Sequence, residues 1–123
     1  YKALQACMRS HGNDMLFYNE INLEIFTDEI SDLSKKEYVQ KLFPNYRHEE
    51  LAETIGVLEV LYETEGSITT ASEELHMHKN TLQYKLKRIY ERTGYDPRSL
   101  RYSALFLIAI DFYREIRGLL DEE

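Results

Sequence analysis

The sequence is poor in several residue types that mark particular classes of protein. Its single cysteine excludes an internal disulfide framework and zinc sites built from several thiolates. Two prolines and five glycines leave little room for a turn-rich all-β fold. The longest apolar run, 104–110, has seven residues, whereas a membrane-spanning helix needs about 20. We therefore expect no membrane partner, and the low cysteine content fits a cytoplasmic location.

Charge is plentiful but unevenly distributed. The chain carries 15 basic and 22 acidic residues, a net charge of −7. Residues 51–75 hold six acidic and no basic residues (−6), whereas residues 76–101 hold seven basic and two acidic residues (+5). A local basic block can bind phosphate in a chain of negative net charge, provided that the acidic block faces away. Charge alone leaves open the alternative that these lysines and arginines only cover a solvated helix face.

The first 46 residues show weak patterns. A helix end fits 2–10, and the apolar residues of 17–26 fit a strand as well as a helix. Ser34 and Glu37 have the spacing of a capping box at the start of a short helix. We expect 1–46 to be a short segment, mixed or helical, that forms the tail of an upstream sensory or intermediate domain or a pair of linker helices.

The sequence from residue 47 on predicts an all-α helical bundle. Gly66 and Gly94 follow helical patterns and are expected to end two of the helices. Pro97 is expected near the first turn of the last one, where its missing N–H costs nothing. The helices are expected over 48–64, 67–75, 79–93 and from about 97 to 116.

The apolar residues of the last two helices predict which side faces the core. In the third helix the inward residues are expected to be Leu82, Leu86, Ile89 and Tyr90. Segment 104–110 of the last helix is apolar all round, so it is either deeply buried or covered by a partner chain. The inward residues expected there are Leu100, Ala104, Leu107, Ile108, Phe112 and Ile116.

Residues 67–90 have the layout of a helix-turn-helix. Ser67 is expected to cap the short first helix. That helix carries Ala71 and Ser72 where two helices would cross, and Met77 supplies an apolar plug for the connection. The longer second helix has one apolar face and leaves a polar face free. The major groove of B-DNA, about 12 Å wide, admits such a helix. Spacing alone is a moderate signal, because helix pairs with short connections are common in all-α proteins.

The run 78–89, HKNTLQYKLKRI, resembles the core of the C-terminal helix-turn-helix of the PucR/CdaR family. Members of that family are bacterial regulators of purine catabolism and sugar-diacid use, and the fold is more distantly similar to the Fis type. The flanks match as well, at Leu51 and Thr54 and at 93–96. The resemblance implies that 47–123 is a sequence-specific DNA-binding domain whose helix 79–92 enters the major groove of double-stranded DNA. It also implies a homodimer and a small-molecule effector that an upstream domain senses.

The helix-turn-helix layout and the resemblance together predict two groups of DNA contacts. Lys79, Asn80 and Gln83 are expected to read base edges. Lys79, Gln83 and Lys85 stand where the family has arginine, so a different operator is expected. The phosphate contacts are expected from His78, Thr81, Tyr84, Lys85, Lys87, Arg88 and Arg101.

No catalytic residue, metal ligand or cofactor is expected. His76 and His78 are two residues apart and have no partner ligands nearby, so a cap for His78 is favoured over a metal site. Phosphate loops and nucleophile elbows are missing, which argues against an enzyme. Two alternatives remain open: a helical protein–protein interaction module that does not bind DNA, and an enzyme or ligand-sensor fragment in 1–47.

Overall fold

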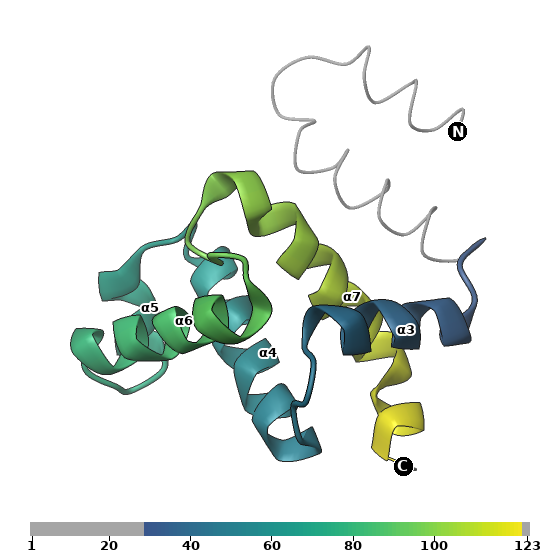
Figure 1. Ribbon diagram of the computed structural model, residues 1–123. Coiled ribbons are helices and arrows are strands. Elements are labelled where there is room, and N and C mark those ends of the chain that lie inside the picture. The colour runs from purple at the N-terminus through teal and green to yellow at the C-terminus, as the bar shows by residue number, and fades with distance from the viewer. Residues whose placement is uncertain (1–28, 122–123) are drawn as a thin grey trace. The chain divides into compact units, whose positions relative to one another are not determined.

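The computed structural model describes residues 29–121 of the chain (Figure 1). In that range the chain forms helices and no strand, which confirms the all-α prediction. None of the helices in this range has both the length and the apolar content that crossing a bilayer requires. The expectations for 2–10 and 17–26 lie outside the described residues. The helices are α3 (Asp32–Leu42), α4 (His48–Glu63), α5 (Ile68–Glu74), α6 (Lys79–Thr93) and α7 (Leu100–Asp121).

Two compact units divide the chain, and the second, Lys35–Glu123, contains the helix-turn-helix. Within this unit the later part of α3 packs on α7. The Tyr38 hydroxyl donates to the Leu105 carbonyl at 2.8 Å, and its ring meets Phe112 edge-on at 5.3 Å. The buried ammonium of Lys35 pairs with Glu115. The unit thus starts upstream of the boundary expected at 46/47, and the assignment of 1–46 to an upstream domain stays a prediction.

The core lies where α4 packs against α7 and α5. Leu58 and Leu61 of α4 are fully buried, as are Phe106 and Ile116 of α7. A side-chain hydrogen bond at the edge of this core supplements the apolar packing. The Tyr62 hydroxyl donates to the carbonyl of Pro97 at 2.8 Å, which ties the end of α4 to the turn before α7.

Two of the predicted helix ends are confirmed and one predicted helix start is wrong. Gly66 and Gly94 have φ values of 81° and 87°, the left-handed conformation that ends a helix at little cost for glycine. The capping box expected at Ser34 and Glu37 does not form. Ser31 caps α3 instead and accepts from the Ser34 N–H at 3.1 Å. The helix starts one turn earlier than predicted, so Ser34 lies inside it.

Two apolar positions predicted to face inward are exposed near the ends of α6 and α7. Tyr90 of α6 is 46% exposed, and Leu100 at the start of α7 is 89% exposed. Pro97 lies in the turn before α7, which begins at Leu100, and is thus near the first turn of that helix as predicted. Its ring is buried.

The phase predicted for α7 is also wrong over its middle. Ala104 and Leu107 are exposed and Ile108 is half-buried, whereas Phe112 and Ile116 are buried as expected. A segment that is apolar all round carries no periodicity that could fix its phase. The contacts with other helices decide it, and the buried set is Phe106, Ala109, Ile110, Phe112, Ile116 and Leu120.

Substitutions at two adjacent residues of α7, one buried and one exposed, test which face of the helix is buried. Phe106→Ala removes a fully buried ring that lies 6.0 Å from the ring of Phe43. We expect it to lower the free energy of unfolding by about 3–5 kcal/mol, measured by denaturant titration. Leu107→Ala, at a side chain that is 41% exposed, is the matched control and should cost less than about 1 kcal/mol. Equal losses in the two variants would contradict the orientation of α7.

Candidate nucleic-acid interface

The first helix of the pair, α5, is built from short-range contacts that the sequence predicts. Ser67 caps it, because its hydroxyl oxygen accepts from the Thr70 N–H at 3.2 Å. The small residues Ala71 and Ser72 are buried where α5 meets α6. Met77 is half-buried in the connection, and its N–H donates to the Ser72 carbonyl at 3.0 Å. The predicted helix-turn-helix layout is therefore confirmed.

His78 begins α6. Its Nδ1 accepts from the Asn80 N–H at 3.0 Å, so the predicted capping role is confirmed. In the neutral ring the proton then lies on Nε2, which is left as a donor for another group. His76, two residues earlier, has a φ of 55° and turns the chain between the helices. The described residues contain no group of three or more side chains that could hold a metal ion.

One face of α6 holds the helix in the domain and the other faces outward. Leu82, Leu86 and Ile89 are buried. The predicted base-reading residues are exposed, within the first two turns. The ring of Tyr84, a predicted phosphate contact, is 63% exposed. The structure thus brings together on exposed α6 surface Lys79, Asn80, Thr81, Gln83, Tyr84, Lys87 and Arg88.

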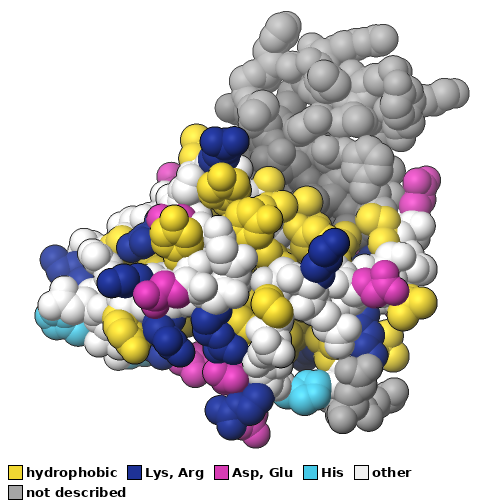
Figure 2. All heavy atoms as spheres, viewed as in Figure 1, with side chains coloured by type: hydrophobic (Ala, Val, Ile, Leu, Met, Phe, Trp, Pro, Cys, Tyr) yellow, Lys and Arg dark blue, Asp and Glu magenta, His cyan; other side chains and the backbone are white. Residues whose placement is uncertain are grey.

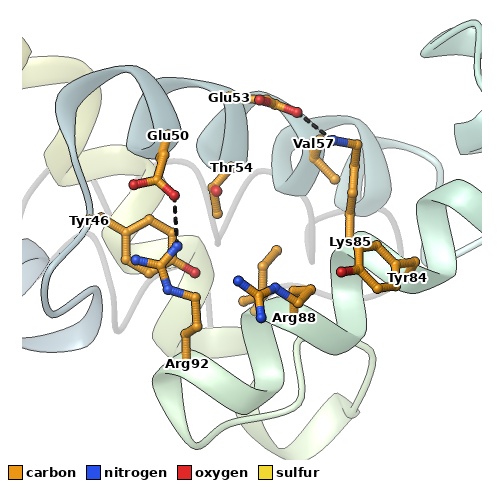
Figure 3. A pocket seen from close by; sticks show the side chains of 10 residues that line it. Tyr46, Glu50, Glu53, Thr54, Val57, Tyr84, Lys85, Arg88 and Arg92 are labelled. Atoms are coloured by element: carbon orange, nitrogen blue, oxygen red, sulfur yellow. Dashed lines mark hydrogen bonds and ion pairs between the residues drawn. The ribbon is translucent and has the colours of Figure 1, made fainter.

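On the flank of α6 that faces α4, two cationic side chains are paired with carboxylates of α4 (Figure 3). Lys85 Nζ lies 2.5 Å from a Glu53 carboxylate oxygen, and Arg92 pairs with Glu50 at 3.0 Å. Arg88 lies between these two pairs, and it has no ion pair with any residue that the structure describes (Figure 3). Lys85, a predicted phosphate contact, is therefore already paired within the protein.

The acidic stretch 51–75 does not face wholly away from α6. Glu53 turns toward α6, whereas Glu59 pairs with Arg114 of α7 at 2.6 Å. Figure 2 shows lysine and arginine side chains spread over the part of the surface where α5 and α6 lie, interrupted by carboxylates. The basic block is consequently less positive than its sequence suggests.

A network that sequence reasoning missed joins the end of α6 to the start of α4. Arg92 donates to the Asn45 carbonyl at 3.1 Å, and its guanidinium lies 3.7 Å from the centroid of the Tyr46 ring. The Arg47 N–H, the Arg47 side chain and Arg92 all donate to the Glu50 carboxylate and lower its pKa to about 2. The spacing of Arg47 and Glu50 is the only local sequence signal for this network. Its third member, Arg92, lies 42 residues from Glu50 and gives no such signal.

Arg101 is the one predicted phosphate contact that lies on another element. It belongs to the first turn of α7 and is exposed. Its guanidinium lies 5.5 Å from the centroid of the Tyr102 ring. The structure does not join it to the α6 cluster through any described contact, so its role stays a prediction.

The part of the chain that contains this helix pair is similar to a known protein family. The family described as the PucR C-terminal helix-turn-helix domain matches residues 54–111, from within α4 to within α7. Residues 54–111 form a PucR-type helix-turn-helix domain. The PucR-type domain belongs to a non-enzymatic family of DNA-binding regulatory modules.

A curated protein is also similar to part of the chain. The uncharacterized protein YsfB of Bacillus subtilis (strain 168) is 29% identical over 80 residues, which are 64% of this chain and 21% of YsfB. The chain thus spans about a fifth of the length of the curated relative that it matches. No solved structure matches.

The low pKa of Glu50 predicts a pH-dependent contribution to stability. The carboxyl ordinarily titrates near 4.5 and here near 2, so the ionised form stabilises the fold above about pH 4.5. That contribution is lost as the pH falls toward 2. We expect Glu50→Gln to lower Tm at neutral pH, with a difference from wild type that shrinks below about pH 4. Parallel Tm–pH curves for the two proteins would contradict the network. Glu49→Gln, at an exposed neighbour, is the control and should leave the curve unchanged.

Proposed function

We propose that this chain is a sequence-specific DNA-binding module of a bacterial transcriptional regulator and that α6 enters the major groove. The observation that supports the proposal is the outward face of α6 in a PucR-type domain. Lys79, Asn80 and Gln83 are exposed there, on the first two turns. Their side chains make no hydrogen bond or ion pair with any residue of the described part of the chain, so they are available to base edges.

Each base-reading side chain has a matching chemistry. The amides of Asn80 and Gln83 can pair with N6 and N7 of adenine, and Lys79 can donate to O6 or N7 of guanine. In a helix-turn-helix the residues near the start of the second helix reach the base edges. Specificity is therefore assigned to these three residues.

The phosphate contacts are proposed to fix the position of α6 in the groove. Lys87 and Arg88 are exposed and carry full charges, while Thr81 and Tyr84 offer hydroxyl groups. His78 offers Nε2 at the start of the helix, next to the free backbone N–H groups that favour an anion.

One such module reads only a few base pairs, so the proposal includes a homodimer on two half-sites. In DNA complexes of this kind the half-sites lie about 34–36 Å apart, one turn of the duplex. A small-molecule effector sensed by an upstream domain and a cytoplasmic location also belong to the proposal. The effector rests on the resemblance to the family, and the location rests on the low cysteine content.

Selection of bound duplexes from a random DNA pool, at two salt concentrations, tests the function. We expect an enriched motif, and an inverted repeat spaced by about one turn would support the dimer. A folded sample that retains no duplex at either salt concentration would reject DNA binding and favour the protein–protein interaction module.

Substitutions on α6 separate base readout from phosphate contact. Lys79→Ala with Gln83→Ala should abolish the preference for the enriched motif over a scrambled duplex, measured by fluorescence anisotropy. Lys87→Ala should weaken binding to both duplexes equally and lower the slope of log affinity against log salt by about one. Arg117→Ala, an equal charge change on an exposed position of α7, is the control. An intact preference in the double variant would remove Lys79 and Gln83 from base readout.

A further inference from the structure

The groove between α4 and α6 is lined by more cationic side chains than carboxylates (Figure 3). It has a volume of about 180 Å³ and is lined by Lys85, Arg88 and Arg92 from α6 and by Glu50 and Glu53 from α4. Two of the three cations face a carboxylate at ion-pair distance, and Arg88 does not. The groove adjoins Tyr84, which lies on the exposed surface of α6.

The two ion pairs of the groove differ in how firmly they are held. Arg92 makes contacts with Glu50, the Asn45 carbonyl and the Tyr46 ring at once. The Lys85–Glu53 pair is a single contact between side chains that are 34% and 61% exposed. Exposed pairs of this kind stabilise a fold little and are screened by salt. Lys85 can therefore leave Glu53 without loss of structure, whereas Arg92 cannot leave its network as easily.

Lys85 lies on the flank of α6 that faces α4. When the second helix of a helix-turn-helix lies in the major groove, the DNA phosphates pass along the flanks of that helix. Lys85 is one residue from Tyr84 and three from Arg88, so one phosphate group can reach Lys85 and Arg88 together. Such a phosphate would also meet the Glu53 carboxylate, which repels it.

We propose that Glu53 is an intramolecular competitor of DNA phosphate for Lys85. This inference rests on the proposed function, and it names the residue that limits the electrostatic part of that function. While the pair is closed, Lys85 neutralises no phosphate and releases no counterion from the DNA. A phosphodiester must displace the carboxylate before Lys85 contributes, so Glu53 lowers both the affinity and the salt dependence of binding.

Glu53→Gln in the 123-residue chain tests the competition. The probe is a fluorescently labelled mixed-sequence duplex, because a phosphate contact does not depend on the operator. We expect severalfold tighter binding at low salt and a slope of log affinity against log salt that is steeper by about 0.9. Adding Lys85→Gln to Glu53→Gln should return the slope to the wild-type value, because the released lysine is then missing.

Glu59→Gln is the matched control. It makes the same charge change on the same helix and also opens an ion pair, but that pair joins α4 to Arg114 of α7. We expect its slope to equal that of the wild type. An equal gain for Glu59→Gln and Glu53→Gln would trace the effect to net charge and overturn the competition.

The experiment separates the failure of this inference from the failure of the proposed function. If the wild-type protein binds the duplex and Glu53→Gln binds with the same affinity and slope, the inference is wrong and the proposed function stands. If none of the folded variants binds the duplex even at low salt, DNA binding itself is rejected and the inference is rejected with it.

Discussion

The burial of one face of α4 against α7 is the contact on which the rest of the described structure depends. Leu58 and Leu61 are fully buried there, with Phe106 and Ile116 opposite. Because α4 is fixed by this apolar packing, its other sides are free to hold α5 and to face α6. The helix-turn-helix is thus carried by a helix that the core has already positioned. A DNA-reading helix needs such support, because base contacts require a fixed orientation.

Polar contacts complete the orientation that apolar packing begins. Leu82, Leu86 and Ile89 hold α6 along its buried face, but an apolar face alone permits some rotation and sliding. Arg92 removes much of that freedom near the end of α6, since it binds Glu50 and the Asn45 carbonyl from one guanidinium. At the other end of α6, the His78 cap fixes where the helix begins. The orientation of the outward face of α6 is consequently fixed by contacts at both ends of the helix.

Features encoded by neighbouring residues could be predicted from the sequence, and features that depend on distant residues could not. The caps at Ser67 and His78 and the helix end at Gly94 need only local hydrogen bonds and backbone angles. The phase of α7 could not be predicted, because apolar residues surround it and contacts such as that of Phe106 with Phe43 decide it. The pairing of Lys85 with Glu53 could not be predicted, because the two residues lie 32 positions apart in the sequence.

Under the proposed function, the partly neutralised flank of α6 affects the strength of DNA binding and leaves the sequence preference unchanged. Phosphate contacts hold every sequence equally, so strong backbone attraction raises binding to all competing sites together. In the proposed complex, Glu53 of α4 beside α6 would reduce that common term, while Lys79, Asn80 and Gln83 stay exposed on the outward face of α6. In the proposed complex the specific and the non-specific affinity then fall by the same factor, and their ratio, which depends on the base contacts, is unchanged. The proposed function is therefore compatible with a net charge of −7, because the side chains proposed to read bases are not paired with any carboxylate of the described residues.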